Sequence, residues 1–175
     1  MNARRAGGFS LIELVVVVVA VGVLCGVALD RLLPLVGRAQ RAAFVQVRSE
    51  LQSALLLEAA DRITRGEAVT LGELAAANPM TLLLQAPENY LGELDPSAAH
   101  SAPGHTWYFD AAQRRLVYRV GRYTRFEPRD AAADRIALAV HLAYADVDGN
   151  GAFDPVRDRF HGLRLDTLTA YRWPD

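Results

Sequence analysis

The sequence has a single cysteine, Cys25, among 175 residues, so it cannot close an internal disulfide or supply a CxxC metal site. Its 19 basic and 20 acidic side chains nearly cancel, which excludes an overall basic nucleic-acid binder and an acidic disordered tail. The common hydrolase and nucleotide-binding motifs are absent, and no two histidines have the spacing of a helical zinc pair. Apolar residues make up 51% of the chain, enough for the core of one domain or two, and they are unevenly distributed.

The longest apolar run covers residues 9–29, where Ser10 and Glu13 are the only polar side chains. As a helix this run is roughly 31 Å long, about the thickness of the hydrocarbon layer of a bilayer. It is therefore long enough to span a membrane. Because Arg4 and Arg5 precede it, the positive-inside rule places this end in the cytoplasm and the remainder of the chain beyond the membrane.

Three interpretations of the run compete. A plain single-pass anchor leaves Glu13 unexplained, because a carboxylate inside a membrane helix is costly and usually functional. A cleaved secretory signal fits poorly, since the run is long for such a signal and ends at Asp30 and Arg31 rather than at a small-residue cleavage site. The third interpretation gives Glu13 a role.

The residues around Glu13 carry a family resemblance. The stretch RAGGFSLIEL at residues 5–14, followed by a valine-rich segment, resembles the class III leader of type IV pilins and of type II secretion pseudopilins. In that family a prepilin peptidase in the membrane cuts after the glycine and methylates the new amine. The resemblance therefore implies a leader peptide at residues 1–8, cleavage between Gly8 and Phe9, and N-methylation of Phe9.

The resemblance also implies that Glu13 acts in filament assembly. Cleavage leaves an ammonium group on Phe9 at the edge of the bilayer, where an unpaired charge is costly. In the family, the glutamate of one subunit pairs with the amine of its neighbour and sets the register while the apolar helices pack into the filament core. The implied partners are other pilin or pseudopilin subunits, the prepilin peptidase and the assembly platform of the inner membrane.

The helical pattern continues beyond the membrane. Residues 30–65 show an amphipathic period and are expected to form the second half of one helix, with a bend near Pro34 and an end at residues 64–66. The pattern predicts that residues 66–104 are a connecting region of turns. Two short helices are expected within it, at residues 71–77 and 80–84.

Residues 66–175 are expected to form a globular head, in which residues 105–173 are predicted to form a sheet. Alternating apolar residues predict strands at residues 106–109, 116–120 and 136–144, and a last strand pair at 160–165 and 168–173. Together with the helix they predict an α+β, pilin-like fold, in which a long N-terminal helix packs on an antiparallel sheet of about four strands.

Residues 146–154, DVDGNGAFD, match the first nine positions of a calcium-loop template. Alternate side chains from position 146 aim oxygens at one point, and Gly151 permits the sharp turn. The template's last ligand is a glutamate, but the chain has Arg157 there, so we expect Asp158 to replace it. The alternative is an ordinary turn. The predicted calcium ligands are Asp146, Asp148, Asn150, the carbonyl group of Ala152, Asp154 and Asp158.

The resemblance supports calcium, since major pseudopilins bind it in this region. Many pilins close the C-terminal part of the head with a disulfide, which this chain cannot form, and the calcium loop is the candidate that would pin this part instead.

Two other functions remain open. Arginines alternate with tyrosines over residues 114–125, a pattern that can grip single-stranded nucleic acid and would suit a DNA-binding minor pilin of a competence system. The acidic side chains around this stretch favour a solvated strand face instead. A membrane-anchored periplasmic enzyme would keep its leader and carry a deep polar pocket. The preferred interpretation is a non-enzymatic, single-pass inner-membrane subunit with a periplasmic head, from a type II secretion or type IV pilus-like system.

Overall fold

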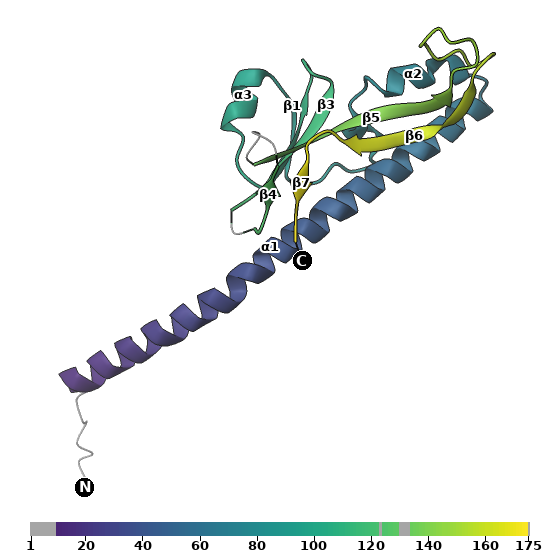
Figure 1. The fold of residues 1–175 in the computed structure, drawn as a ribbon. Helices are drawn as coiled ribbons and strands as arrows, with labels where there is room; N and C mark the ends of the chain where they lie inside the picture. The colour runs from purple at the N-terminus through teal and green to yellow at the C-terminus, as the bar shows by residue number, and fades with distance from the viewer. Residues whose placement is uncertain (1–9, 123, 130–133, 175) are drawn as a thin grey trace.

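A single long helix dominates the computed structural model, which describes residues 10–122, 124–129 and 134–174. Helix α1 runs over Leu11–Thr64 and extends far beyond the globular head at its N-terminal end (Figure 1). Within the described residues it is the one helix that is long and apolar enough to cross a membrane, and the head buries none of its most apolar window. The predicted two-part helix is therefore present.

Local interactions explain where α1 begins and ends. The Ser10 hydroxyl oxygen accepts a hydrogen bond from the backbone amide of Glu13 at 3.2 Å, which caps the first turn. Pro34 lies inside the helix without ending it. The helix stops at Thr64, within the predicted limits, and Gly66 adopts a φ of 78° that turns the chain away.

The main sheet has five strands in the order β1-β2-β3-β5-β6 and is mixed rather than antiparallel. The four antiparallel strands are those predicted, whereas β1 pairs in parallel with β2 at the edge of the sheet. The strands are β1 (Tyr90–Leu94), β2 (Thr106–Asp110), β3 (Arg115–Arg119), β5 (Arg135–Ala145) and β6 (Arg159–Thr167).

The connecting region contains more regular structure than its turn residues predict. It supplies strand β1 and helix α3 (Pro96–Ser101), which carries the chain over to the parallel strand β2. Gly92 within β1 and Pro96, two residues after the end of the strand, hide the alternation that marks a strand. Before β1 lie three short helical segments, η1 (Ala68–Thr70), α2 (Leu71–Leu74) and η2 (Pro79–Leu82).

The predicted C-terminal strand pair is wrong. Strand β6 pairs with β5, and the two-residue strand β7 (Tyr171–Arg172) pairs with β4 (Glu127–Pro128) in a second, small sheet. The loop after β3 therefore reaches the C-terminus, a long-range contact that strand patterns do not reveal.

The C-terminal half of α1 forms one wall of the core. Phe44, Leu51 and Leu55 form a stripe that points into the head and are at most 2% exposed, in agreement with the amphipathic period predicted for residues 30–65. The side chain of Gln52 connects α1 to the edge strand β6. Its NH2 group donates to the Leu163 carbonyl oxygen at 2.7 Å, and its oxygen accepts from the backbone amide of Leu165 at 2.9 Å. The helix therefore covers an edge that would otherwise be free to pair with another chain.

An aromatic cluster around Phe44 holds the C-terminal segment. The Phe44 ring stacks on Trp107 with centroids 5.3 Å apart and meets Trp173 at 5.7 Å. Trp173 also stacks on Tyr118 and is 8% exposed. These contacts anchor the end of the chain without a disulfide, a role that the sequence assigns to the calcium loop.

Candidate assembly helix and metal loop

The first half of α1 presents its apolar side chains outward on every side. Residues 10–32 are all exposed, Glu13 among them. Two glycines on this half, Gly22 and Gly26, have no atom within 4 Å of the position that a Cβ would take. The fold of one subunit therefore does not require glycine there, whereas the four-residue spacing permits close approach of another helix.

Glu13 is a charged residue in the first turn of α1, at one end of this exposed apolar surface. Glu13 occupies the third helical position after Ser10, the pattern S-x-x-E of a capping box. That pattern is visible in the sequence, and of its two hydrogen bonds the structure shows the one from the backbone amide of Glu13 to the Ser10 hydroxyl oxygen. The predicted cleavage and methylation positions, Gly8 and Phe9, lie outside the described residues.

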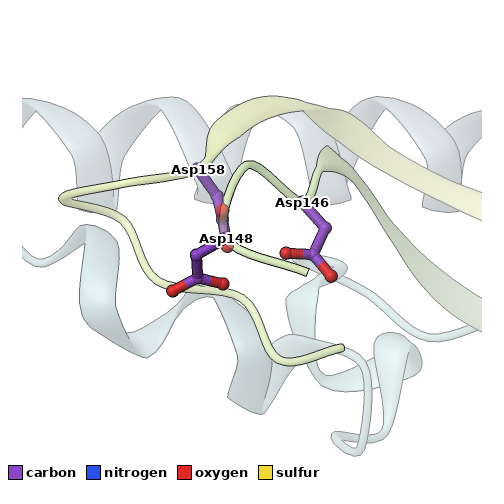
Figure 2. Close-up of side chains that lie close together, drawn as sticks. All are labelled: Asp146, Asp148 and Asp158. Carbon is purple, nitrogen blue, oxygen red and sulfur yellow. The ribbon is translucent and has the colours of Figure 1, made fainter. Parts of the chain in front are cut away.

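The loop between β5 and β6 gathers three of the predicted metal ligands. One carboxylate oxygen from each of Asp146, Asp148 and Asp158 lies within 4.8 Å of the other two (Figure 2). Oxygens that bind one calcium ion at about 2.3–2.6 Å lie at most roughly 5 Å apart, so this spacing fits a shared ion. Asp158, the proposed substitute for the missing glutamate, is therefore placed next to the first two ligands of the loop.

Backbone amides orient two of these carboxylates. Asp158 is 8% exposed, and its oxygens accept from the amides of Val147 at 2.9 Å and Asp154 at 2.8 Å, which ties the two ends of the loop together. The amides of Gly151 and Gly149 donate to Asp146 and hold the pKa of its carboxyl below the usual value. Asp146 is therefore ionised at neutral pH, as a metal ligand must be.

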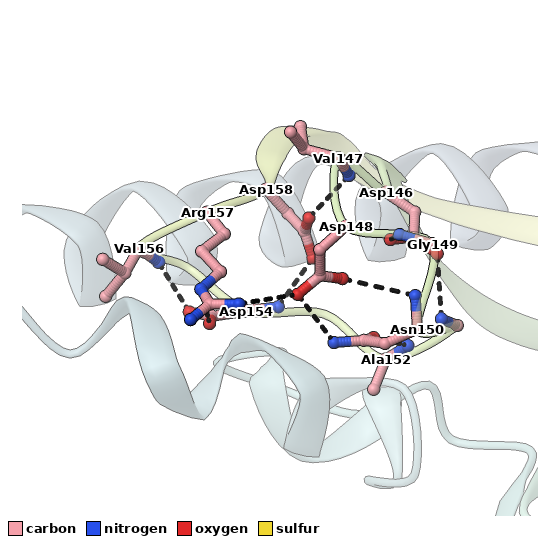
Figure 3. Close-up of polar contacts among 11 residues, drawn as sticks. Asp146, Val147, Asp148, Gly149, Asn150, Ala152, Asp154, Val156, Arg157 and Asp158 are labelled. Atoms are coloured by element: carbon pink, nitrogen blue, oxygen red, sulfur yellow. Dashed lines mark hydrogen bonds and ion pairs between the residues drawn. The ribbon is translucent and has the colours of Figure 1, made fainter.

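The other predicted ligands make contacts within the loop (Figure 3). The Asn150 side chain donates to Asp148 at 3.0 Å and accepts from the amide of Ala152 at 2.7 Å. Asp154 accepts from the amide of Val156 at 2.9 Å and is not part of the three-carboxylate group. The structure thus brings together Asp146, Asp148 and Asp158, and leaves Asn150, Ala152 and Asp154 as predicted ligands.

Three residues in the middle of the arginine- and tyrosine-containing stretch take part in the fold. The Arg119 guanidinium donates to Asp134 at 2.8 Å and to the carbonyl oxygens of His100 and Ala102. Arg115 pairs with Asp110 at 3.4 Å. Tyr118 lies in the core, where burial raises its pKa, so its ring is not available for stacking on a base. Tyr123 lies outside the described residues. These contacts weigh against a nucleic-acid surface.

Comparison with known families bears on the N-terminal segment alone. A family model described as the prokaryotic N-terminal methylation motif matches residues 3–29. The chain carries a class III prepilin leader. This leader is typical of type IV pilin-like and pseudopilin subunits. No curated protein and no solved structure matches the chain significantly.

The prepilin leader and the fold agree with each other. The matched residues end inside α1, and the helix continues without a break into the wall of the head's core. A long N-terminal helix that packs on a sheet is the layout expected of a pilin-like subunit. One apolar helix together with the leader fits a single-pass membrane-anchored protein.

Proposed function

We propose that this chain is a pseudopilin of a type II secretion or type IV pilus-like system. It is cut between Gly8 and Phe9, methylated at Phe9, and held in the inner membrane by α1 with its head in the periplasm. The methylation motif over residues 3–29 carries the proposal, because it combines the peptidase signal with the membrane helix in one segment. In this proposal the protein acts as a structural component of a filament and does not catalyse a reaction.

The exposed half of α1 supports assembly with other subunits. Side chains such as Val18 at 62% and Leu24 at 68% exposure have no partner within their own head. Before assembly these side chains contact lipid, and in a filament they pack against the helices of neighbouring subunits. Glu13 then provides the one carboxylate near the new N-terminus, and its pairing with the Phe9 amine of a neighbour sets the axial register.

Calcium belongs to the same proposal as a structural ion of the head. Asp146, Asp148 and Asp158 supply three carboxylates at a spacing that fits one ion. The donor set is all oxygen, as calcium prefers, and Gly151 has the left-handed conformation, φ 74°, that the turn requires. A bound ion would neutralise these carboxylates, while the buried Asp158 side chain ties β5 to β6.

The pairing of Glu13 makes a specific prediction. Two differently tagged copies, cleaved and extracted in mild detergent, should co-purify, and Glu13→Gln should weaken this association at least about tenfold. A charge-assisted hydrogen bond contributes about 1.5–3 kcal/mol, and about 1.4 kcal/mol corresponds to tenfold. Glutamine is the informative replacement, because it keeps the S-x-x-E/Q capping box and removes only the charge.

Asp30→Asn provides the matched control, since it removes the other carboxylate that bounds the apolar run. The sequence contains no lysine, so the N-terminal amine is the chain's only aliphatic amine and any carbodiimide amide link between copies must start there. We expect that link to map to Glu13. Association that survives Glu13→Gln unchanged, or a link that maps to Asp30 instead, would contradict the assembly proposal.

A further inference from the structure

The twelfth position of the metal loop holds a cation in place of a ligand. The Nη1 atom of Arg157 lies 3.3 Å from a carboxylate oxygen of Asp148, and its Nε atom lies 3.7 Å from one of Asp154 (Figure 3). In the calcium-loop template this position is a bidentate glutamate, so its charge is opposite. The guanidinium thus contacts two of the predicted calcium ligands, one of which, Asp148, belongs to the three-carboxylate group.

The burial of the three partners differs. The Arg157 side chain is 66% exposed, whereas those of Asp148 and Asp154 are 24% and 37% exposed. The arginine can therefore swing into solvent, while Asp148 stays near the other carboxylates. An exposed ion pair contributes little to stability and breaks readily, so the contact is suited to exchange.

We propose that Arg157 is a tethered cation that neutralises the loop when no metal is present and competes with calcium for Asp148 and Asp154. This inference rests on the proposed calcium site. Without a metal, the carboxylates of Asp146, Asp148 and Asp158 repel one another, and the guanidinium offsets part of that repulsion. With calcium bound, a guanidinium a few ångströms away repels the ion and must move out.

The competition has two consequences of opposite sign. Arg157 stabilises the metal-free loop, so removing it should lower the melting temperature in chelator. Arg157 also weakens calcium binding, so removing it should tighten the affinity. The arginine therefore helps to set the calcium concentration at which the metal ion replaces the guanidinium group beside the carboxylates.

The test measures calcium binding and thermal unfolding of the full-length protein in detergent. It compares the parent protein with the Arg157→Ala and Arg159→Ala variants. Arg159 is the matched control, because it is exposed at the start of β6, two residues further on, and its removal changes the net charge by the same amount. We expect Arg157→Ala to lower the melting temperature in chelator and to tighten calcium binding about two- to fivefold, the range of a broken exposed ion pair. Arg159→Ala should do neither.

Arg157→Glu restores the template ligand and should tighten binding further than alanine does. Calcium binding that is equal in the parent and in Arg157→Ala would overturn the role of Arg157 while leaving the calcium site in place. An absence of calcium binding in the parent and in Arg157→Glu would overturn both the competition and the calcium site. The two failures are therefore distinguishable.

Discussion

Phe44→Ala is expected to lower the free energy of unfolding of the head by about 3–5 kcal/mol, the range for truncation of a buried phenylalanine. Phe44 is 2% exposed and its ring contacts Trp107, Tyr118 and Trp173. Its loss leaves a cavity where α1, the sheet and the C-terminal segment meet. Denaturant unfolding followed by tryptophan fluorescence reports this region directly, because both tryptophans of the chain lie in the cluster.

Val45→Ala is the matched control for Phe44. Val45 is the next residue on α1 and is 51% exposed, so its truncation should change the unfolding free energy by less than about 0.5 kcal/mol. Equal effects of the two substitutions would mean that the head does not fold against this side of the helix.

Calcium is expected to raise the melting temperature of the protein relative to chelator. A ligand at 100 times its Kd stabilises the folded state by about 2.7 kcal/mol, which in a protein of this size corresponds to roughly 5–10 °C. Asp158→Asn should abolish most of this shift, because Asp158 is the buried carboxylate of the group and lies beside the other two.

Asp166→Asn is the control for Asp158. Asp166 lies on the same strand β6, has a half-exposed side chain and pairs with Arg164 at 3.8 Å, away from the loop. It should leave the calcium response intact. A protein whose melting temperature is the same in calcium and in chelator, or an Asp158→Asn variant that responds like the parent, would exclude calcium as a structural ion.

The calcium response should also depend on pH. Folding lowers the pKa of Asp146, so its contribution to stability is present above the unfolded pKa and is lost as the pH falls through the lower, folded value. Calcium requires the ionised form, and the calcium-induced shift should therefore shrink under acidic conditions and stay constant near neutral pH.

The features that sequence predicts well here are local ones. The leader, the membrane half of α1 and the buried stripe through Phe44 and Leu51 depend on composition and helical period alone. The four antiparallel strands likewise follow from alternation. The grouping of Asp146, Asp148 and Asp158 was also predictable, because these residues lie close together in the chain, whereas their binding of calcium stays a prediction.

The missed features depend on contacts between distant residues. Strand β1 exists because β2 offers it a parallel edge, and its own five residues, with Gly92 in the middle, give little sign of it. The pairing of β4 with β7 joins residues more than forty positions apart. Arg157 is a mismatch to the template in the sequence, and only the fold shows that it contacts Asp148 and Asp154.

The prepilin leader is the central claim, and the intact mass of the protein tests it most directly. We would compare protein extracted from membranes of cells with and without an active prepilin peptidase. The account predicts that the active peptidase removes Met1 to Gly8 and adds one methyl group, and that the full chain persists without it. A chain that stays uncut in the presence of the peptidase, or a cut beyond Leu29, would contradict it.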